Sequence, residues 1–107
     1  MKIRLRDVAA FRADRMAKVA VAATPRVLVD LYCLEPGQAQ APHAHAEQDK
    51  IYVALEGRVR VRLDGAEHTL EAGEAVVAAA GREHGVTNDS GARAVLLVVV
   101  APPPPHA

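Results

Sequence analysis

The sequence has few cysteines, which could cross-link a small domain, and few aromatic residues, which could fill its core. It contains one cysteine, Cys33, three aromatic residues and no tryptophan in 107 residues. A single cysteine excludes an internal disulfide framework and a cysteine-rich zinc module. We therefore expect Cys33 to be a small buried hydrophobic residue. Half of the residues are hydrophobic, and most of these are Ala and Val, which favours a core of packed strands.

Neither sign of charge is in excess, and long apolar runs are absent. Thirteen Lys and Arg balance thirteen Asp and Glu, which argues against a broad basic surface for nucleic acid. The longest apolar run, residues 94–101, has the length of a strand and falls short of the ~20 residues of a membrane span. The N-terminus is charged and lacks an apolar signal region. We expect a cytoplasmic protein with neither nucleic acid nor membrane as a partner.

The length predicts one domain. A chain of 107 residues is sufficient for one hydrophobic core and too short for two. Because such a chain buries a modest fraction of its surface, pairing with a second copy would stabilise it, and we expect a homodimer. The domain is predicted over residues 1–101. The proline-rich tail, residues 102–107, is expected to leave it as extended polyproline chain.

Short runs of strand-forming residues, separated by turn signals, predict eight or nine strands. Residues 58–63 alternate Arg with Val or Leu, which indicates a half-buried strand with a solvated outer face. Asp64 and Gly65 then predict a type I′ hairpin. Residues 8–11 fit either a turn of helix or an edge strand. The spacing of turns favours an all-β sandwich or barrel, with strands at residues 16–23, 26–34, 51–55, 58–63, 67–70, 75–78, 84–88 and 93–100.

Two of the five histidines are spaced for a shared role. His43 and His45 are two residues apart, so on an extended segment their side chains lie on the same face. Two neutral imidazoles on one face form half of a site for Zn, Fe, Cu or Ni. We expect His68 and His106 to be solvated and without a role.

Residues 37–57 place glycine and histidine at a recognisable spacing. Gly37 is followed after five residues by the His43–His45 pair, and Gly57 closes the segment. This spacing resembles the first of the two motifs of the cupin family.

Residues 73–88 resemble the second cupin motif. The matching residues are Gly73, Gly81, His84 and Asn88, while Ala79 stands where the family usually has Pro. The resemblance implies a small jelly-roll β-barrel with one divalent metal ion at its centre. The candidate ions are Fe, Mn, Zn and Ni.

Carried over by position, the resemblance implies His43, His45 and His84 as metal ligands. The family's fourth ligand, a Glu, is replaced here by Lys50, and an ammonium group repels a cation at short range. Three arrangements stay open. The three imidazoles hold the metal alone with open positions, or Asp49 or Glu47 supplies the missing carboxylate, or no metal binds and the imidazoles form hydrogen bonds to a ligand.

The position of Lys50 on a predicted strand indicates which other side chains lie near the histidines. If residue 50 faces the barrel interior, Tyr52 faces it too, because side chains alternate along a strand. We predict that Tyr52 lines the pocket, as the only aromatic residue directed towards the histidines. Lys50 and Tyr52 are the candidate catalytic residues. A lysine beside three imidazoles favours a small anionic ligand, such as a carboxylate or an enolate. Gly81 and Gly85 are expected to serve turn geometry.

Two classes of function follow. The resemblance implies an enzyme with dioxygenase-like or isomerase-like chemistry on a small molecule, in which the metal acts as a Lewis acid or activates oxygen. The alternative is a non-catalytic cupin that binds a small ligand or a metal. The fold alone does not choose between them.

Overall fold

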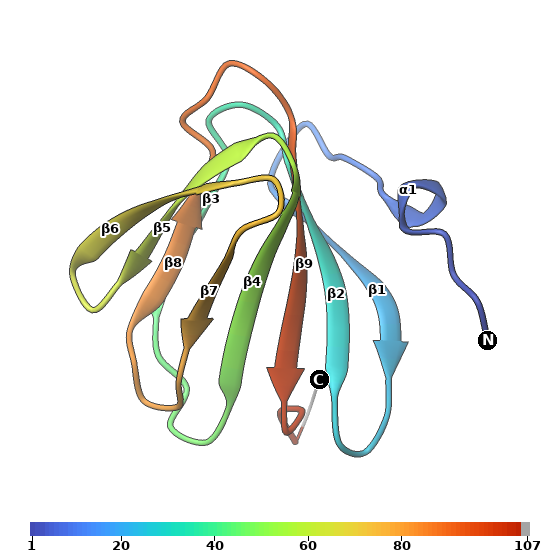
Figure 1. Cartoon of the computed structure of the whole chain (residues 1–107), viewed down its shortest axis with the longest axis vertical. Coiled ribbons are helices and arrows are strands. Elements are labelled where there is room, and N and C mark those ends of the chain that lie inside the picture. Colours follow the sequence, from blue (N-terminus) through green and yellow to red (C-terminus); the bar gives the residue numbers. More distant parts are fainter. Residues whose placement is uncertain (106–107) are drawn as a thin grey trace.

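The computed structural model describes residues 1–105 and consists almost entirely of strands (Figure 1). One helix of four residues, α1, precedes the strands, and no helix in this part of the chain is long and apolar enough to cross a membrane. The elements are α1 Leu5–Val8, β1 Ala17–Ala23, β2 Leu28–Leu34, β3 Ala39–His43, β4 Asp49–Glu56, β5 Arg58–Leu63, β6 Ala66–Glu71, β7 Ala75–Ala78, β8 His84–Thr87 and β9 Ala94–Ala101.

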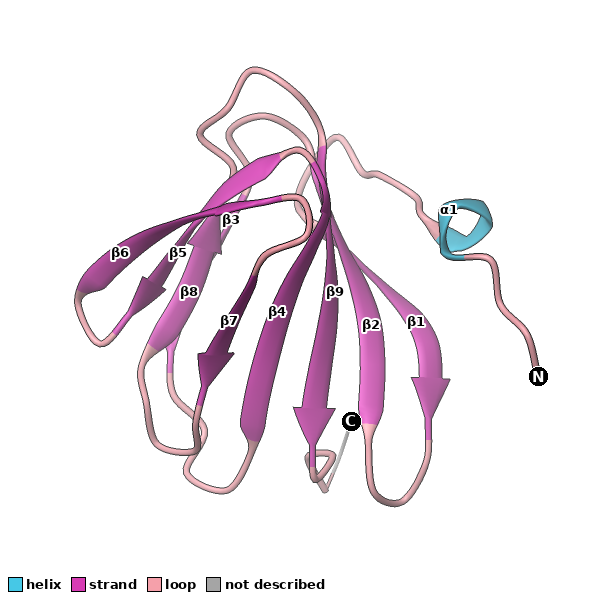
Figure 2. Ribbon diagram, viewed as in Figure 1, coloured by secondary structure: helices cyan, strands magenta, loops and turns pink. Residues whose placement is uncertain are grey.

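The strands form two antiparallel sheets (Figure 2). The first has five strands in the order β1-β2-β9-β4-β7, and the second has four in the order β3-β8-β5-β6. Neighbouring strands come from distant parts of the sequence, as in the pairing of β2 and β4 with β9. The predicted all-β jelly-roll fold is confirmed.

The main core lies between the two sheets. Because side chains alternate along a strand, Tyr32 and Leu34 of β2 join this core, whereas Leu31 and Cys33 face the other way. That outer face is covered near β1 by the N-terminal segment, including Leu5 (Figure 1). Cys33 is fully buried, as expected for a small hydrophobic residue. The inner core consists of Tyr32, Leu34, Tyr52, Ala54, Val59, Val61, Leu70, Val86, Ala94, Leu96, Val98 and Val100.

The hairpin between β5 and β6 forms as predicted. Leu63 pairs with Ala66 across a two-residue turn. Asp64 and Gly65 in that turn have φ angles of 48° and 81°, the left-handed values that a type I′ turn needs. The three arginines of β5 are exposed, while the intervening valines are buried. This strand therefore has the solvated outer face expected from its alternation.

Two elements differ from prediction. The helix covers Leu5–Val8, whereas a helical turn or edge strand was expected over residues 8–11. Strand β3 was not predicted, since its sequence Ala-Gln-Ala-Pro-His contains a proline and only weak strand formers. It forms because it lies at the edge of the four-stranded sheet and pairs only with β8, and an edge strand tolerates proline.

The described part of the tail does not leave the domain. Pro103 and Pro104 are half-buried, and Pro104 lines the same cavity as Leu28 and Val100. Pro103 and Pro104 therefore lie against the domain, whereas Pro102 and Pro105 are exposed, as expected of a tail. Partial burial of the two proline rings reduces the apolar area exposed to water, which a fully extended tail would not achieve. His106 lies outside the described residues.

Gly85 determines how closely β3 and β8 approach each other. A Cβ atom at this position would lie 2.8 Å from the Gln40 carbonyl oxygen and 2.9 Å from the Pro42 nitrogen. Its role is therefore close backbone approach and not turn geometry, which corrects the expectation. Gly81, with φ +82°, does serve a turn.

Replacing Gly85 tests this close approach. We expect Gly85→Ala to lower the free energy of unfolding by about 1–3 kcal/mol, because the added methyl group meets backbone atoms. Gly91→Ala is the control, since a Cβ at Gly91 meets no atom within 4 Å, and it should change stability by less than about 1 kcal/mol. Urea denaturation measures both values, and equal effects would contradict the crowding.

Candidate functional site

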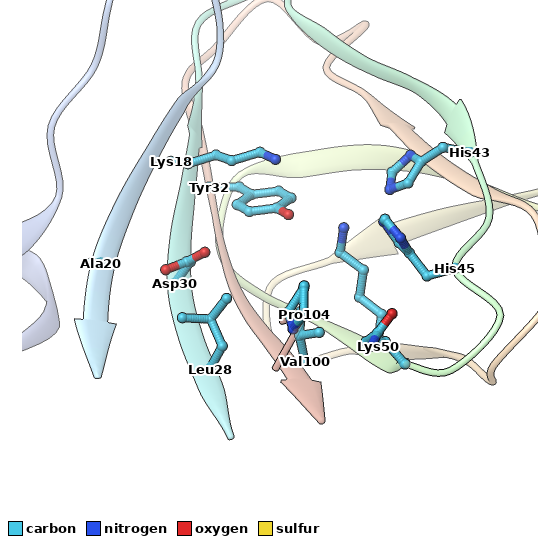
Figure 3. A pocket seen from close by; sticks show the side chains of 11 residues that line it. Lys18, Ala20, Leu28, Asp30, Tyr32, His43, His45, Lys50, Val100 and Pro104 are labelled. Carbon is cyan, nitrogen blue, oxygen red and sulfur yellow. The ribbon is translucent and has the colours of Figure 1, made fainter. Parts of the chain in front are cut away.

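A cavity of about 410 Å³ opens between the inner face of the five-stranded sheet and the segment that carries His43 and His45 (Figure 3). Lys18, Asp30, Tyr32 and Lys50 reach into it from β1, β2 and β4. The complete lining is Lys18, Ala20, Leu28, Asp30, Tyr32, His43, His45, Gln48, Lys50, Val100 and Pro104.

The three histidines named from the sequence lie together beside this cavity. His43 and His84 are cross-strand partners on β3 and β8, and their ring centroids are 4.4 Å apart. The ring of His45 lies 4.9 Å from that of His43 and 6.2 Å from that of His84. The pairing of β3 with β8, which Gly85 permits, thus unites residues from the two motifs.

Backbone carbonyls fix how two of the rings carry their protons. His43 Nδ1 is 2.9 Å from the Ala41 oxygen, and His84 Nδ1 is 2.9 Å from the Arg82 oxygen. A carbonyl only accepts, so each Nδ1 donates its hydrogen and each Nε2 keeps a free lone pair. Burial lowers the pKa of both imidazoles, and the positive charge of Lys50 acts in the same direction. Both rings are thereby favoured in the neutral form.

His84 Nε2 is the one buried side-chain nitrogen or oxygen in residues 1–105 without a hydrogen-bond partner. Such an atom costs about 1–3 kcal/mol unless something binds to it, and a neutral imidazole with a free Nε2 is the form that ligates metals. The donor chemistry therefore fits a metal ion. In their present orientations, however, no group of three or more His, Cys, Asp or Glu side chains in this range has metal-holding geometry.

Lys50 enters the site where the family's carboxylate was expected. Its side chain is 4% exposed, and Nζ lies 5.1 Å and 5.4 Å from the ring centroids of Tyr32 and Tyr52. Its hydrogen-bond acceptor is Gln40 Oε1, at 3.5 Å. No carboxylate of residues 1–105 forms an ion pair with it. Burial lowers the pKa of Lys50 to about 8, and the charge of Lys18 contributes.

The cavity is lined by Tyr32 and not by Tyr52, which the sequence had predicted there. Tyr52 is fully buried and does not line the cavity, although its ring is 6.0 Å from that of His84. Tyr32 lines the cavity instead and packs edge-on against Tyr52 with centroids 6.3 Å apart. Tyr52 is nevertheless the tyrosine whose ring lies near a histidine ring, so it faces the histidines from behind the cavity lining. Burial raises the pKa of Tyr32 to about 12 and that of Tyr52 further, so both hydroxyls keep their protons at neutral pH.

Two predicted carboxylates are not brought to the histidines. Asp49 is exposed, and its Oδ1 accepts a hydrogen bond of 2.9 Å from the Ala80 backbone nitrogen. It points away from Lys50 because neighbouring residues on a strand face opposite sides. Glu47 is exposed and does not line the cavity. His68 is exposed on β6, outside the site.

The sequence reasoning missed Gln40, Lys18 and Asp30. Gln40 Oε1 accepts from both Lys50 Nζ and the Tyr52 hydroxyl, the latter at 3.4 Å. It was missed because β3 was missed. Asp30 carried a signal that went unused, since a carboxylate within the apolar run of β2 must face a polar cavity or solvent.

Comparison with known proteins identifies relatives of the whole chain. The cupin domain model matches residues 30–100, and none of the curated proteins matches. The structure of TT1209 from Thermus thermophilus is 48% identical, covers 97% of this chain and 100% of its own, and has a TM-score of 0.93. A structure named sugar phosphate isomerase from a cupin superfamily, from Silicibacter pomeroyi, is 29% identical over 85% of this chain and 62% of its own, with a TM-score of 0.77.

The structure of KdgF from Halomonas sp. is also similar. It covers 85% of this chain and 82% of its own, with a TM-score of 0.80. Its sequence identity is 24%, so it supports the fold.

The pKa of Lys50 predicts a change of stability with pH. In the metal-free protein the folded pKa of about 8 lies below the ordinary value of 10.5, so the folded state loses this proton first. Stability should therefore rise by roughly 2 kcal/mol between pH 8 and about 10. Burial also raises the pKa of the Cys33 thiol above its ordinary value of 9.0, which opposes part of this rise in every variant, and above pH 10 the raised pKa values of the tyrosines act in the same opposing direction.

Urea denaturation at pH 7.5, 8.5 and 9.5 in the presence of a chelator measures this rise. We expect Lys50→Met to remove it and Lys2→Met, outside the cavity, to retain it. If the free energy of unfolding of Lys50→Met rises with pH by the same amount, another titratable group causes the rise.

Proposed function

This chain belongs to the cupin family, and we propose that it binds a small organic anion at a metal ion held by His43, His45 and His84. The observation that carries the proposal is the buried, unpartnered Nε2 of His84, next to two further imidazoles. Three imidazoles are a sufficient protein ligand set for a metal that keeps open positions for water or substrate. The missing fourth carboxylate does not prevent this.

The side chains around the histidines favour a negatively charged ligand. Lys50 is buried without an ion pair in residues 1–105, and a buried charge is stabilised by an anion of opposite sign. A metal bound there would act as a Lewis acid on an oxygen atom of the ligand. The similar structure from Silicibacter pomeroyi is named a sugar phosphate isomerase, and sugar phosphates are anionic.

The chain's own groups have distinct roles in this proposal. Lys50 offsets the charge of the ligand and, with its pKa near 8, can hold or release a proton near neutral pH. Gln40 orients Lys50 and Tyr52 through one carbonyl oxygen. The apolar wall of Leu28, Val100 and Pro104 excludes water from one side of the ligand and strengthens the electrostatic attraction.

These roles suit an isomerase-like proton transfer in which Lys50 carries the proton. Tyr52 shares the Gln40 acceptor with Lys50 and helps to hold it in place. Dioxygenase-like chemistry is the other enzymatic reading of the family. A non-catalytic binding protein is the second candidate, favoured by the burial of Tyr52 behind the cavity. Pairing with a second copy and a cytoplasmic location stay predictions from the sequence.

Metal analysis of the untagged protein tests the metal site. We expect about one equivalent of divalent metal per chain in the wild type and less than about a tenth of that in His84→Ala, because the variant loses one of three ligands. His68→Ala is the control, since His68 is exposed on β6, and it should keep the metal. Equal, negligible metal in all three proteins would overturn the metal site.

Lys50→Glu tests whether residue 50 occupies the fourth coordination position. A carboxylate there should raise the metal affinity about tenfold or more, because an attractive ligand replaces a repelling cation. Lys18→Glu makes the same change of charge elsewhere in the cavity and should raise it less. Competition with a chelator measures the affinities. An unchanged affinity in Lys50→Glu would mean that residue 50 does not reach the metal.

A further inference from the structure

The lysines of this chain are concentrated at the cavity. The sequence contains three, Lys2, Lys18 and Lys50, and the last two line the cavity described above. No arginine of residues 1–105 lines it, although arginine provides most of the positive charge of the chain. The cavity therefore holds two compact ammonium groups, each of which can approach a separate oxygen atom of a ligand.

Both ammonium groups lie close to one tyrosine ring. Lys18 Nζ is 5.4 Å and Lys50 Nζ 5.1 Å from the centroid of Tyr32. Lys18 is the cross-strand partner of Tyr32 on β1, whereas Lys50 comes from β4, and both side chains reach towards the ring (Figure 3). Lys18 is exposed and Lys50 is buried. The two charges thus lie at the outer and inner parts of the same cavity.

The cavity has more positive than negative charge. Among the described residues, Asp30 is the only carboxylate in its lining, and it forms no ion pair with either lysine. Burial raises the pKa of Asp30, and the two lysines oppose that rise. One positive charge is therefore left over before any charge at the histidines is counted. Because Asp30 pairs with neither lysine, and a divalent metal ion at the histidines would add further positive charge, a ligand with two negative groups can pair with both lysines.

We propose that the ligand is a short dicarboxylate that lies along the cavity, with one carboxylate at Lys50 and the histidines and the other at Lys18. Its carbon chain lies over the ring of Tyr32, which both ammonium groups approach. The proposal rests on the proposed function, since it assumes an anion at Lys50. It adds that Lys18 determines the preference for a second negative group.

Two probes with the same number of carbon atoms separate binding of an anion at Lys50 from binding of a second carboxylate at Lys18. Succinate and butyrate both have four carbons, and only succinate carries a second carboxylate. We expect the untagged full-length protein to bind succinate about fivefold or more tightly than butyrate in calorimetric titrations. Lys18→Met should reduce this ratio to about one by weakening succinate binding about threefold to fivefold, which is the range of a partly exposed charge pair. Lys2→Met is the control and should keep the wild-type ratio.

Lys50→Met distinguishes failure of the inference from failure of the proposed function. It should weaken both probes about tenfold or more, because it removes the buried charge. If Lys18→Met keeps the wild-type ratio while Lys50→Met loses both probes, the dicarboxylate proposal is wrong and the anion site stands. If Lys50→Met binds both as the wild type does, or the wild type binds neither, the anion at Lys50 and the dicarboxylate are both overturned. Lys18→Gln should reproduce Lys18→Met and guards against misfolding of one variant.

Discussion

The pairing of β3 with β8 is the constraint on which the site depends. These strands bring His43 opposite His84, and they can do so because Gly85 has no side chain to meet the backbone of residues 40–42. The same approach brings Gln40 to Lys50 and Tyr52. One backbone contact therefore assembles the imidazoles and supplies the hydrogen-bond acceptor for the lysine. Without it His43 and His84 would not lie opposite each other.

The second determinant is a positive charge placed among groups that have lost contact with water. Lys50 is buried by Tyr32 and Tyr52, and no carboxylate in the described chain pairs with it. Burial of this kind costs free energy unless a ligand compensates for it. The unpartnered Nε2 of His84 likewise costs free energy, because its lone pair is buried without a hydrogen-bond donor. An anion bound at Lys50 should therefore stabilise the folded protein. A cation or a hydrogen-bond donor bound at the lone pair of His84 Nε2 should do the same.

The sequence permitted prediction of most strands because their signals are local, whereas the grouping of His84 with His43 and His45 came from the resemblance to the two cupin motifs. Alternation in residues 58–63 and the Asp64–Gly65 turn depend on neighbouring residues alone. Strand β3 could not be predicted, since its pairing with β8 outweighs a proline-containing sequence with weak strand propensity. The roles of Gln40 and Lys18 were lost for the same reason, as both depend on which strands become neighbours. Tyr32 and Tyr52 share the inner face of the sheet, and only their positions along the packed strands decided that Tyr32 and not Tyr52 lines the cavity.

What the sequence determined by itself was the family, through glycine and histidine spacing, and the replacement of the expected carboxylate by Lys50. Spacing along the chain sets these features, so no tertiary contact is needed to read them. Only the tertiary structure decided that Asp49 turns away to Ala80, that Pro104 lines the cavity, and that Lys18 joins Lys50 around one ring. Each of these depends on side chains from separate strands meeting across a sheet, and such meetings are set by the packing of the whole barrel.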